Sequence, residues 1–493
     1  MSIISINNLT FCYDGSYEDI FSNVSFQIST DWKTGFTGRN GRGKTTFLKL
    51  LLGEYEYSGI ISHDMDFEYF PYQTSDNQRN GIDIVGDICP AYEYWELSRE
   101  LSILKVSDEV LFRPFNTLSN GEQTKIMLAA MFLNENSFLL IDEPTNHLDI
   151  EGRQLVSDYL KNKSGFILIS HDRAFLDNCI DHIIAINKTN IEVKKGDFST
   201  WLHNKALEDN FEISENEKLK KDIKRLSKAA KRSSDWSDKT AKSKFGVKNS
   251  GSSIDRGFVG HKAAKMMKSA KNLESRQSSA IDEKAKLLKN VETAEKLKIN
   301  QFDFHTNKLV DIENLSVFYD NKPVCKGISF TIEKGDRIVL KGKNGSGKSS
   351  ILKLICGEKI DCTGNILINS QLKISYVSQN TGFLKGNLID FAKENDIEDS
   401  LFKAILRKLD FSRTQFEKNI EDFSGGQKKK VLIAKSLCEK AHLHIWDEPL
   451  NFIDVISRMQ IEQLLLENKP TILFVEHDSA FCENVATKYV EVN

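Results

Sequence analysis

The sequence lacks any apolar run of the roughly 18–20 residues that a membrane-spanning helix needs. Its first residues, Met1 to Ser5, have neither the basic start nor the cleavage site of a signal peptide. The eight cysteines are scattered, with no Cys-x-x-Cys pair and no paired histidines, which argues against structural zinc and against a disulfide framework. We therefore expect a cytoplasmic protein with reduced thiols and no membrane segment.

The charge is unevenly distributed. The 493 residues carry a net charge of −3, but the stretch from Lys218 to Lys271 has 17 Lys or Arg against 4 Asp or Glu. That stretch is therefore +13, and the rest of the chain is −16. A basic block in an otherwise acidic protein predicts a polyanionic partner for one segment.

The sequence contains two copies of one set of motifs, in the same order. Each copy has a glycine-rich loop ending in Gly-Lys-Thr or Gly-Lys-Ser, a Ser-x-Gly-x-Gln or similar segment, an apolar strand ending in Asp-Glu, and a later histidine. The first copy has residues 38–45, residues 118–123, Asp142-Glu143 and His171; the second has residues 342–349, residues 423–427, Asp447-Glu448 and His477. Like positions are offset by 304 to 306 residues. The chain is therefore predicted to hold two homologous ATPase domains.

The fold is predicted as α/β, with two tandem nucleotide-binding domains and a helical linker. A strand at residues 33–36, a glycine loop at 38–43 and a helix at 44–52 open the first domain's alternating pattern, which implies a mostly parallel sheet covered by helices. The predicted domains are residues 1–202, 203–305 and 306–493.

The middle segment is predicted as an antiparallel helical hairpin with a basic tip at residues 233–260. Apolar residues at helical spacing form one stripe at Leu219, Ile223, Leu226 and Ala230, and a second stripe runs through residues 281–294. A solvated, disordered linker is the alternative, but such a tether has no need of apolar stripes.

The glycine loops have the pattern that cradles nucleotide phosphates with backbone N–H groups and a helix N-terminus. Lys44 and Lys348 are expected to neutralise phosphate oxygens, and Thr45 and Ser349 to bind Mg²⁺. The other loop residues expected to bind ATP are Gly38, Asn40, Gly41, Gly43 and Thr46 in the first copy, and Gly342, Asn344, Gly345, Gly347 and Ser350 in the second.

The acidic pairs at the strand ends suit phosphoryl transfer. Asp142 and Asp447 are expected to bind Mg²⁺, while Glu143 and Glu448 orient and polarise the attacking water. His171 and His477 are assigned to the γ-phosphate and the water. A structural ion pair is the plain alternative for each acid, but it leaves unexplained why both copies end alike.

Together these motifs resemble the ATP-binding cassette superfamily, over both halves of the chain. The resemblance implies that the serine-glycine motif of each domain covers the γ-phosphate held by the other, which pairs Lys44 with Ser424 and Lys348 with Ser119. The signature residues this assigns to ATP binding are Ser119, Gly121 and Glu122, and Ser424, Gly425, Gly426 and Gln427. Tyr13 and Tyr319 match the family's adenine-stacking aromatic, with core packing as an equal alternative for each.

Two positions depart from the family pattern. The first signature has Asn120 where the second has Gly425, and we expect a modest effect because asparagine tolerates unusual backbone angles. The γ-phosphate-sensing glutamine is Gln379, but the aligned first-half position is Tyr72, followed by Gln73. Gln73 is the candidate substitute, and the two sites need not be equivalent.

Tandem cassettes joined by a charged helical linker resemble the ABC-F subfamily of ribosome-binding ATPases. The resemblance implies binding at the tRNA exit site of the 70S ribosome, with the hairpin directed at 23S rRNA near the peptidyl-transferase centre and at P-site tRNA. Basic residues favour RNA phosphates, and aromatic residues are suited to base stacking. The residues assigned to this contact are Lys231, Arg232, Trp236, Lys239, Lys242, Lys244, Phe245, Lys248, Phe258, Lys262, Lys265 and Lys268.

Within that subfamily the chain resembles the antibiotic-resistance members. The sensor-to-signature spacing, 47 residues from Tyr72 and 45 from Gln379, leaves no room for a large inserted arm, and the chain ends 16 residues after His477. Residues 38–46, 263–268 and 446–451 are similar to the Lsa group. That resemblance implies ribosome protection against lincosamides, streptogramin A compounds and pleuromutilins, with release on ATP hydrolysis, by a protein that is a monomer in solution.

Three other functions fit parts of the pattern. A translation factor that acts on stalled ribosomes without conferring resistance would use the same fold. The ATPase subunit of a drug exporter would need a membrane partner, and no docking segment is recognisable. A DNA-structural ATPase would need a far longer coiled coil.

Overall fold

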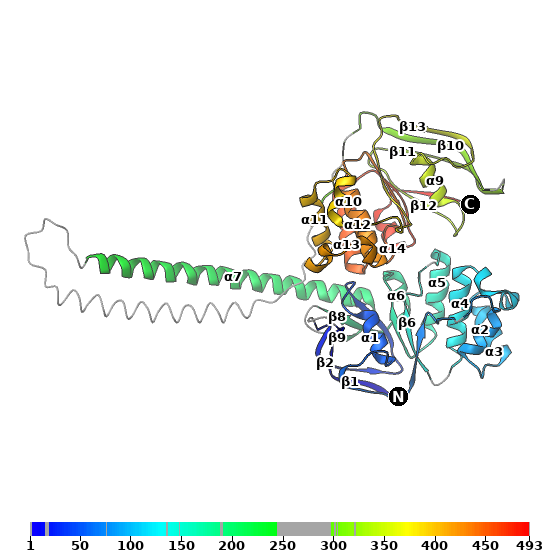
Figure 1. The fold of residues 1–493 in the computed structure, drawn as a ribbon, viewed down its shortest axis with the longest axis horizontal. Coiled ribbons are helices and arrows are strands. Elements are labelled where there is room, and N and C mark those ends of the chain that lie inside the picture. Colours follow the sequence, from blue (N-terminus) through cyan, green and yellow to red (C-terminus); the bar gives the residue numbers. More distant parts are fainter. Residues whose placement is uncertain are drawn as a thin grey trace, which may run out of the picture. The chain divides into compact units, whose positions relative to one another are not determined.

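The computed structural model describes residues 2–14, 19–74, 76–134, 137–146, 148–187, 191–243, 297–299, 302, 304–319 and 322–492. The chain divides into two compact units, residues 1–201 with 294–493, and residues 202–293. The first unit contains two copies of a mixed α/β domain, which confirms the predicted fold class (Figure 1).

The first domain is built on a six-stranded sheet and a smaller antiparallel sheet. The large sheet has the order β5-β6-β7-β3-β8-β9 and is parallel except for the pairing of β8 with β9. Its strands are β3 (Lys33–Gly38), β5 (Asp66–Phe70), β6 (Ser137–Asp142), β7 (Phe166–Ile169), β8 (His182–Ile186) and β9 (Ile191–Lys195). The small sheet, in the order β2-β1-β4, consists of β1 (Ile3–Phe11), β2 (Phe21–Ser29) and β4 (Ser58–Ser62).

The helices of the first domain are α1 (Lys44–Leu51), α2 (Gly81–Ile88), α3 (Tyr94–Ile103), α4 (Asn120–Met131), α5 (Ile150–Lys161) and α6 (Arg173–Cys179), with short 3₁₀ turns at Asp108–Phe112 and Phe115–Thr117. The strand predicted at residues 33–36 continues to Gly38, and the helix predicted at 44–52 ends at Leu51, with Leu52 as its C-cap.

The second domain repeats this plan. Its parallel sheet has the order β14-β15-β16-β12-β17, and its antiparallel sheet has the order β11-β10-β13. The strands are β10 (Lys308–Tyr319), β11 (Lys322–Glu333), β12 (Arg337–Lys341), β13 (Cys362–Ile368), β14 (Ile374–Val377), β15 (Leu443–Asp447), β16 (Ile472–Val475) and β17 (Lys488–Glu491). The helices are α9 (Lys348–Ile355), α10 (Leu388–Glu394), α11 (Asp399–Lys408), α12 (Gly425–Cys438), α13 (Val455–Asn468) and α14 (Ser479–Val485), with 3₁₀ turns at Arg413–Glu417 and Ile420–Asp422.

The central strands explain why the motifs lie where they do. β7 and β16 are buried at every residue, as expected for parallel strands covered on both faces. β6 and β15 pair directly with them, so the strand ends that carry the Asp-Glu pairs and the histidines meet at one edge of each sheet. That edge is where α/β proteins place their ligands.

Helix α7 (Phe198–Ser243) continues from the first domain as one unbroken helix of 46 residues (Figure 1). At 1.5 Å per residue it is about 70 Å long. Residues 198–217 carry five acidic and one basic side chain, whereas residues 218–243 carry three acidic and ten basic ones. Of the predicted apolar stripe, Leu219 and Ile223 are half-buried; the side chains of Leu226 and Ala230, and the whole second stripe, lie outside the described residues.

Helix α7 and the core of the second domain each cross one of the predicted boundaries. α7 begins inside the segment assigned to the first domain, where Phe198 and Trp201 are buried. Leu297 and Phe304 pack into the two cores of the second domain, ahead of its predicted start at residue 306. Among the helices that the structure describes, none is both long and apolar enough to cross a membrane.

Candidate functional site

Each glycine-rich loop connects a buried strand to a helix and has the backbone shape of a phosphate cradle. Gly41 and Gly43 have φ of 82° and 91°, and Gly345 and Gly347 have φ of 81° and 88°. Only glycine adopts this left-handed region without strain. At Gly43 a Cβ would also lie 2.5 Å from the Ile20 Cγ2 atom. The loops therefore place backbone N–H groups at the N-termini of α1 and α9, where anions bind.

The lysine of each loop folds back onto its own cradle. Lys44 Nζ donates to the carbonyl oxygen of Gly38 at 2.8 Å and of Arg39 at 3.2 Å. Lys348 Nζ donates to the carbonyl oxygens of Gly342 and Lys343, both at 2.7 Å. Burial lowers the pKa of both lysines, so an anion in the cradle would compensate the buried charge.

Tyr13 and Tyr319 occupy equivalent positions in the two domains, each beside the start of its own loop helix. The Tyr13 hydroxyl is 2.7 Å from Thr46 Oγ1, and the Tyr319 hydroxyl is 3.0 Å from Ser350 Oγ. Both rings are exposed beside the start of the loop helix, at 40% and 48%. These positions leave a ring face open beside the phosphate cradle.

The residues predicted to bind Mg²⁺ fit that ion. Thr45 Oγ1 donates to Asp142 Oδ2 at 2.8 Å, and Ser349 Oγ donates to Asp447 Oδ1 at 3.0 Å. Each hydroxyl and carboxylate pair supplies hard oxygen ligands at the edge of a phosphate cradle, which is the chemistry that Mg²⁺ requires. Burial raises the pKa of Asp142 and raises that of Asp447 to about 6, so a cation would favour their ionised forms.

Glu143 and Glu448 share an unusual backbone conformation. Their φ angles are 52° and 46°, in the left-handed region that non-glycine residues rarely occupy. Strain of this kind is typical of functional positions held in place by their surroundings. The main-chain N–H of each donates to the neighbouring strand, at Ile169 and Val475, which anchors the strained residue.

The carboxyl groups of the two glutamates have different surroundings. Glu448 Oε2 accepts from Gln379 Nε2 at 2.8 Å and Asn451 Nδ2 at 2.6 Å, and His477 Nε2 lies 3.6 Å from Oε1. Glu143 Oε1 lies 3.3 Å from His171 Nε2, but it accepts no hydrogen bond within the described part of the chain.

These surroundings shift the pKa of the glutamates in opposite directions. Burial, together with the negative charge of Asp142, raises the pKa of Glu143 to about 8. Burial also acts on Glu448, but His477 and the hydrogen bond from Gln379 outweigh it and lower the pKa of Glu448 to about 2. Burial and the nearby Lys44 charge lower the pKa of His171 well below its ordinary value.

Strand register shows which residue occupies the sensor position in the first domain. Val377 pairs with Trp446, just before Asp447, and Phe70 pairs with Ile141, just before Asp142. Tyr72 is therefore the counterpart of Gln379, as the sequence alignment indicated. Gln73 is exposed and donates to no residue that the structure describes, so it does not replace the Gln379–Glu448 hydrogen bond here.

The two signature motifs form helix N-caps. Ser119 caps α4 and Ser424 caps α12, each within a reciprocal capping box, with Glu122 in the first and Gln427 in the second. Asn120 is the first residue of α4 and has no positive φ, so this position does not need glycine. Gly426 is more restricted, because a Cβ there would lie 2.3 Å from the Phe452 carbonyl oxygen.

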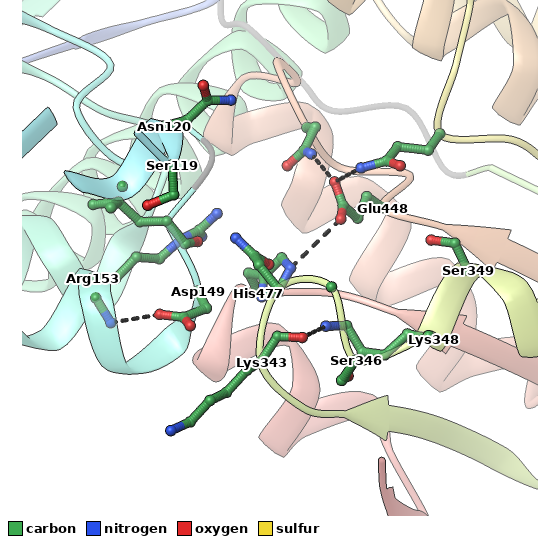
Figure 2. Close-up of a pocket in the computed structure, with 18 of the residues that line it drawn as sticks. Ser119, Asn120, Asp149, Arg153, Lys343, Ser346, Lys348, Ser349, Glu448 and His477 are labelled. Atoms are coloured by element: carbon green, nitrogen blue, oxygen red, sulfur yellow. Dashed lines mark hydrogen bonds and ion pairs between the residues drawn. The ribbon is translucent and has the colours of Figure 1, made fainter. Parts of the chain in front are cut away.

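One cavity, of about 830 Å³, lies between the first signature and the second phosphate loop. In Figure 2, Ser119 and Asn120 lie on the opposite side of this space from the loop that carries Lys343, Ser346 and Lys348. The predicted residues that line it are Ser119, Gly121, Glu122, Tyr319, Asn344, Gly345, Gly347, Lys348, Ser349, Ser350, Gln379, Glu448 and His477. The structure thus brings the predicted partners Lys348 and Ser119 to one site.

Further residues line the cavity but belong to none of the motifs on which the sequence prediction was based. Lys125, Asp149 and Arg153 line the same space, and Figure 2 labels Asp149 and Arg153. Asp149 caps α5, and Arg153 makes a buried ion pair with Asp172 at 2.9 Å. Their counterparts Lys430, Asp454 and Arg458 lie at the same offset of 305 residues, which is the signal that could have identified them.

The first phosphate loop is in direct contact with the second domain. Asn40 Nδ2 donates to the Phe452 carbonyl oxygen at 2.7 Å, and Arg39 forms an ion pair with Asp410 at 3.2 Å. A Cβ at Gly426 would lie 3.1 Å from Asn40 Nδ2. The first phosphate loop therefore lies against Gly426 of the second signature.

The predicted contacts with the ribosome and tRNA fall outside what the structure describes. Lys231, Arg232, Trp236, Lys239 and Lys242 lie on α7, but their side chains are not described. The remaining residues of that set, Lys244, Phe245, Lys248, Phe258, Lys262, Lys265 and Lys268, lie outside the described residues altogether.

Two phosphate cradles, each followed by a buried strand ending in Asp-Glu and paired with a signature helix of the other domain, define a tandem nucleotide-binding ATPase. The family model described as "ABC transporter" matches residues 21–146 and 325–451. The chain belongs to this family, and it is an ATPase. ABC ATPase domains in general use ATP with Mg²⁺.

Relatives of the chain include members of the ABC-F family. The ATP-binding protein Uup of Buchnera aphidicola is 28% identical over 512 residues, covering 99% of this chain and 80% of the relative. The ribosome protection protein VmlR of Bacillus subtilis is 25% identical over 503 residues, covering 100% of this chain and 87% of the relative.

Solved structures share the fold of both domains. The archaeal ribosome recycling factor aABCE1, in a crystal structure of its complex with the archaeal ribosomal stalk protein aP1, matches with a TM-score of 0.64 at 18% identity. The match covers 98% of this chain and 87% of that one. At this identity the likeness shows the fold.

Proposed function

We propose that this ATPase is an ABC-F ribosome protection protein that enters the tRNA exit site and uses its interdomain segment to dislodge antibiotics from the peptidyl-transferase centre. The relative VmlR, which aligns over the whole chain, is named a ribosome protection protein. The drug classes proposed, lincosamides, streptogramin A compounds and pleuromutilins, come from the resemblance to the Lsa group.

The observation that carries the proposal is α7. This helix of 46 residues, about 70 Å long, runs into the segment that joins the two ATPase domains in the sequence. The second half of this helix carries ten basic residues against three acidic ones, and Lys220, Lys221, Lys224 and Lys228 are exposed. A basic rod of this kind suits the phosphates of ribosomal RNA.

The composite sites supply the mechanism for binding and release. With ATP in the cavity, Lys348 would contact the phosphates and Ser119 would cover the γ-phosphate from the other domain, joining the two domains. Mg²⁺ held by Ser349 and Asp447 would neutralise charge developing on the phosphates. Glu448, held by Gln379, orients and polarises the attacking water, and His477 contacts the γ-phosphate. Hydrolysis removes the link between the domains and releases the protein.

The first test is co-sedimentation of the Glu143→Gln, Glu448→Gln double variant with 70S ribosomes in ATP. The variant should remain on ribosomes, because ATP binds but is not cleaved. The matched control carries Lys44→Ala and Lys348→Ala as well, and should stay in the supernatant because it lacks the phosphate contacts. If the double variant is found in the membrane fraction, or only in the supernatant, the proposed binding to ribosomes is contradicted.

Drug protection is tested separately in a susceptible bacterium expressing the chain. Inhibitory concentrations of a lincosamide, a streptogramin A and a pleuromutilin should rise, while that of a small-subunit antibiotic should not. Shortening residues 234–257 should abolish the rise and leave ATP binding intact.

A second function is a translation factor that acts on stalled ribosomes without conferring resistance. The relative Uup, at 28% identity, is named only as an ATP-binding protein, so likeness across the chain does not by itself select resistance. Ribosome retention of the double variant combined with unchanged drug susceptibility would select this second function.

A further inference from the structure

The two candidate catalytic glutamates occupy equivalent places but are held differently. Two side-chain amides, from Gln379 and Asn451, fix Glu448 Oε2 at 2.8 and 2.6 Å. Glu143 has a histidine nitrogen at 3.3 Å from Oε1, an atom that accepts no hydrogen bond from the residues described. A carboxylate that must orient a water needs a fixed position, because misplacement of a catalytic group by 1 Å can cost orders of magnitude in rate.

One source of this difference is the replacement at the sensor position. Gln379 follows β14 and reaches Glu448, whereas its counterpart after β5 is Tyr72, which has no amide to donate. Gln73, one residue further, is exposed. The first domain therefore lacks one of the two amides that hold Glu448 in the second.

The predicted metal-binding acids differ as well. In the first domain Tyr69 donates its hydroxyl to Asp142 Oδ2 at 3.0 Å, and this is the same oxygen that accepts from Thr45. The equivalent hydroxyl in the second domain, on Tyr376, is buried without a hydrogen-bond partner among the described residues. Asp142 is thus engaged twice on one oxygen, while the Tyr376 hydroxyl makes no hydrogen bond to Asp447.

From these three differences we propose that the two composite sites divide the work. The site of Lys348, Glu448 and Ser119 hydrolyses ATP in each cycle, with Gln379 as a positioning residue. The site of Lys44, Glu143 and Ser424 retains ATP for many cycles and turns it over slowly. This proposal deepens the composite-site mechanism put forward above and rests on it.

The decisive experiment compares the basal ATPase of purified full-length single variants without ribosomes. Glu448→Gln should lower kcat at least about ten-fold more than Glu143→Gln does, since general-base groups are worth roughly 10²–10⁴-fold. Equal losses, or a larger loss from Glu143→Gln, would overturn the proposal.

The positioning role is tested with Gln379→Tyr, which installs the first domain's residue at an exposed position. It should reduce kcat roughly ten-fold and change KM less than about three-fold, because the group acts on the transition state rather than on binding. The matched control is Gln371→Tyr, at another exposed glutamine outside the site, which should match the parent. A change in KM alone would overturn the role.

Retention is measured by loading the protein with labelled ATP, removing free nucleotide and counting what stays. About one uncleaved ATP per chain should remain, and Lys44→Ala should remove it. Two retained nucleotides, or none, would overturn the proposal. None of these measurements uses ribosomes, so failure of the ribosomal function leaves them unaffected, and their failure leaves co-sedimentation unaffected.

Discussion

The side chain of Asn40 connects Phe452 to the lysine of the first phosphate loop. Its Nδ2 donates to the Phe452 carbonyl oxygen at 2.7 Å, and its Oδ1 accepts from Lys44 Nζ at 3.3 Å. Phe452 follows the second domain's Asp-Glu pair and has a φ of 63°. The Asn40 side chain thus links Lys44, the candidate phosphate-binding lysine of the first domain, to the backbone of the second domain.

Asn40→Ala should accelerate release of nucleotide from the first site. Removing a hydrogen bond of this kind costs about 0.5–1.5 kcal/mol, which corresponds to a roughly 2–10-fold faster dissociation. Stopped-flow displacement of a fluorescent ATP analogue measures the rate. Asn344→Ala, the same change in the second loop, reports on the second site; an unchanged rate for Asn40→Ala would contradict the role of the Asn40 contact.

Asp454→Ala should destabilise the chain strongly. Lys430 Nζ lies 2.8 Å from Asp454 Oδ2, and both side chains are buried, so the substitution leaves an unpaired buried ammonium. Such losses cost about 3–5 kcal/mol. Urea unfolding of the full chain should show this, whereas Lys393→Met, which removes one partner of the exposed pair with Asp390, should cost less than about 1 kcal/mol.

The stability of the second domain should fall with acidification because of His444. Its ring is fully buried, Nδ1 lies 3.1 Å from Ser436 Oγ, and burial lowers its pKa to about 4. Above pH 6.5 neither the folded nor the unfolded chain binds this proton. Between about pH 6.5 and 4 the unfolded chain binds it first, so unfolding becomes easier by up to about 3 kcal/mol, and the loss is complete below pH 4.

His444→Gln should remove this part of the pH dependence. We would measure the unfolding free energies of the parent and the variant from pH 7 to pH 4. Their difference gives the contribution of His444, because carboxylates that titrate in the same pH range affect both proteins equally. The exposed His63→Gln is the control and should run parallel to the parent. If the unfolding free energies of His444→Gln and of the parent fall in parallel with pH, His444 does not cause this part of the pH dependence.

Replacing Lys220, Lys221, Lys224 and Lys228 with glutamine should weaken ribosome binding and flatten its salt dependence. All four are exposed on α7. Each lysine that contacts a phosphate contributes about 0.7–0.9 to the slope of log affinity against log salt, so the slope should fall by up to about 3. The matched control replaces the exposed Lys322, Lys326, Lys385 and Lys393, an equal change in net charge outside α7. An equal effect of both quadruple variants would mean that only net charge matters.

The sequence predicted what depends on local pattern. The ends of β6 and β15, with Asp142 and Asp447, follow from apolar runs interrupted by acids, and the repeat offset fixes their pairing with the loops. The fold class is confirmed. The start of α7 was less predictable, since Phe198 and Trp201 are helical residues that are also buried in the first domain.

The sequence could not predict which side chains are exposed in the loops, or which contacts form between residues far apart in the chain. Gln73 is a reasonable substitute by spacing, but its side chain is exposed and makes no hydrogen bond to Glu143 within the described part of the chain, which only the structure reveals. The contact of Asn40 with Phe452 involves a main-chain oxygen 412 positions away, which no residue type encodes.

The order of charges along α7 has a consequence for how the protein meets its partner. Acidic residues gather in the first 20 positions and basic ones in the last 26, the arrangement that complements a helix macrodipole. Such a rod is a large permanent dipole. In the field of a polyanion it experiences a torque as well as an attraction, so the molecule would rotate while still at a distance and arrive with its basic end leading.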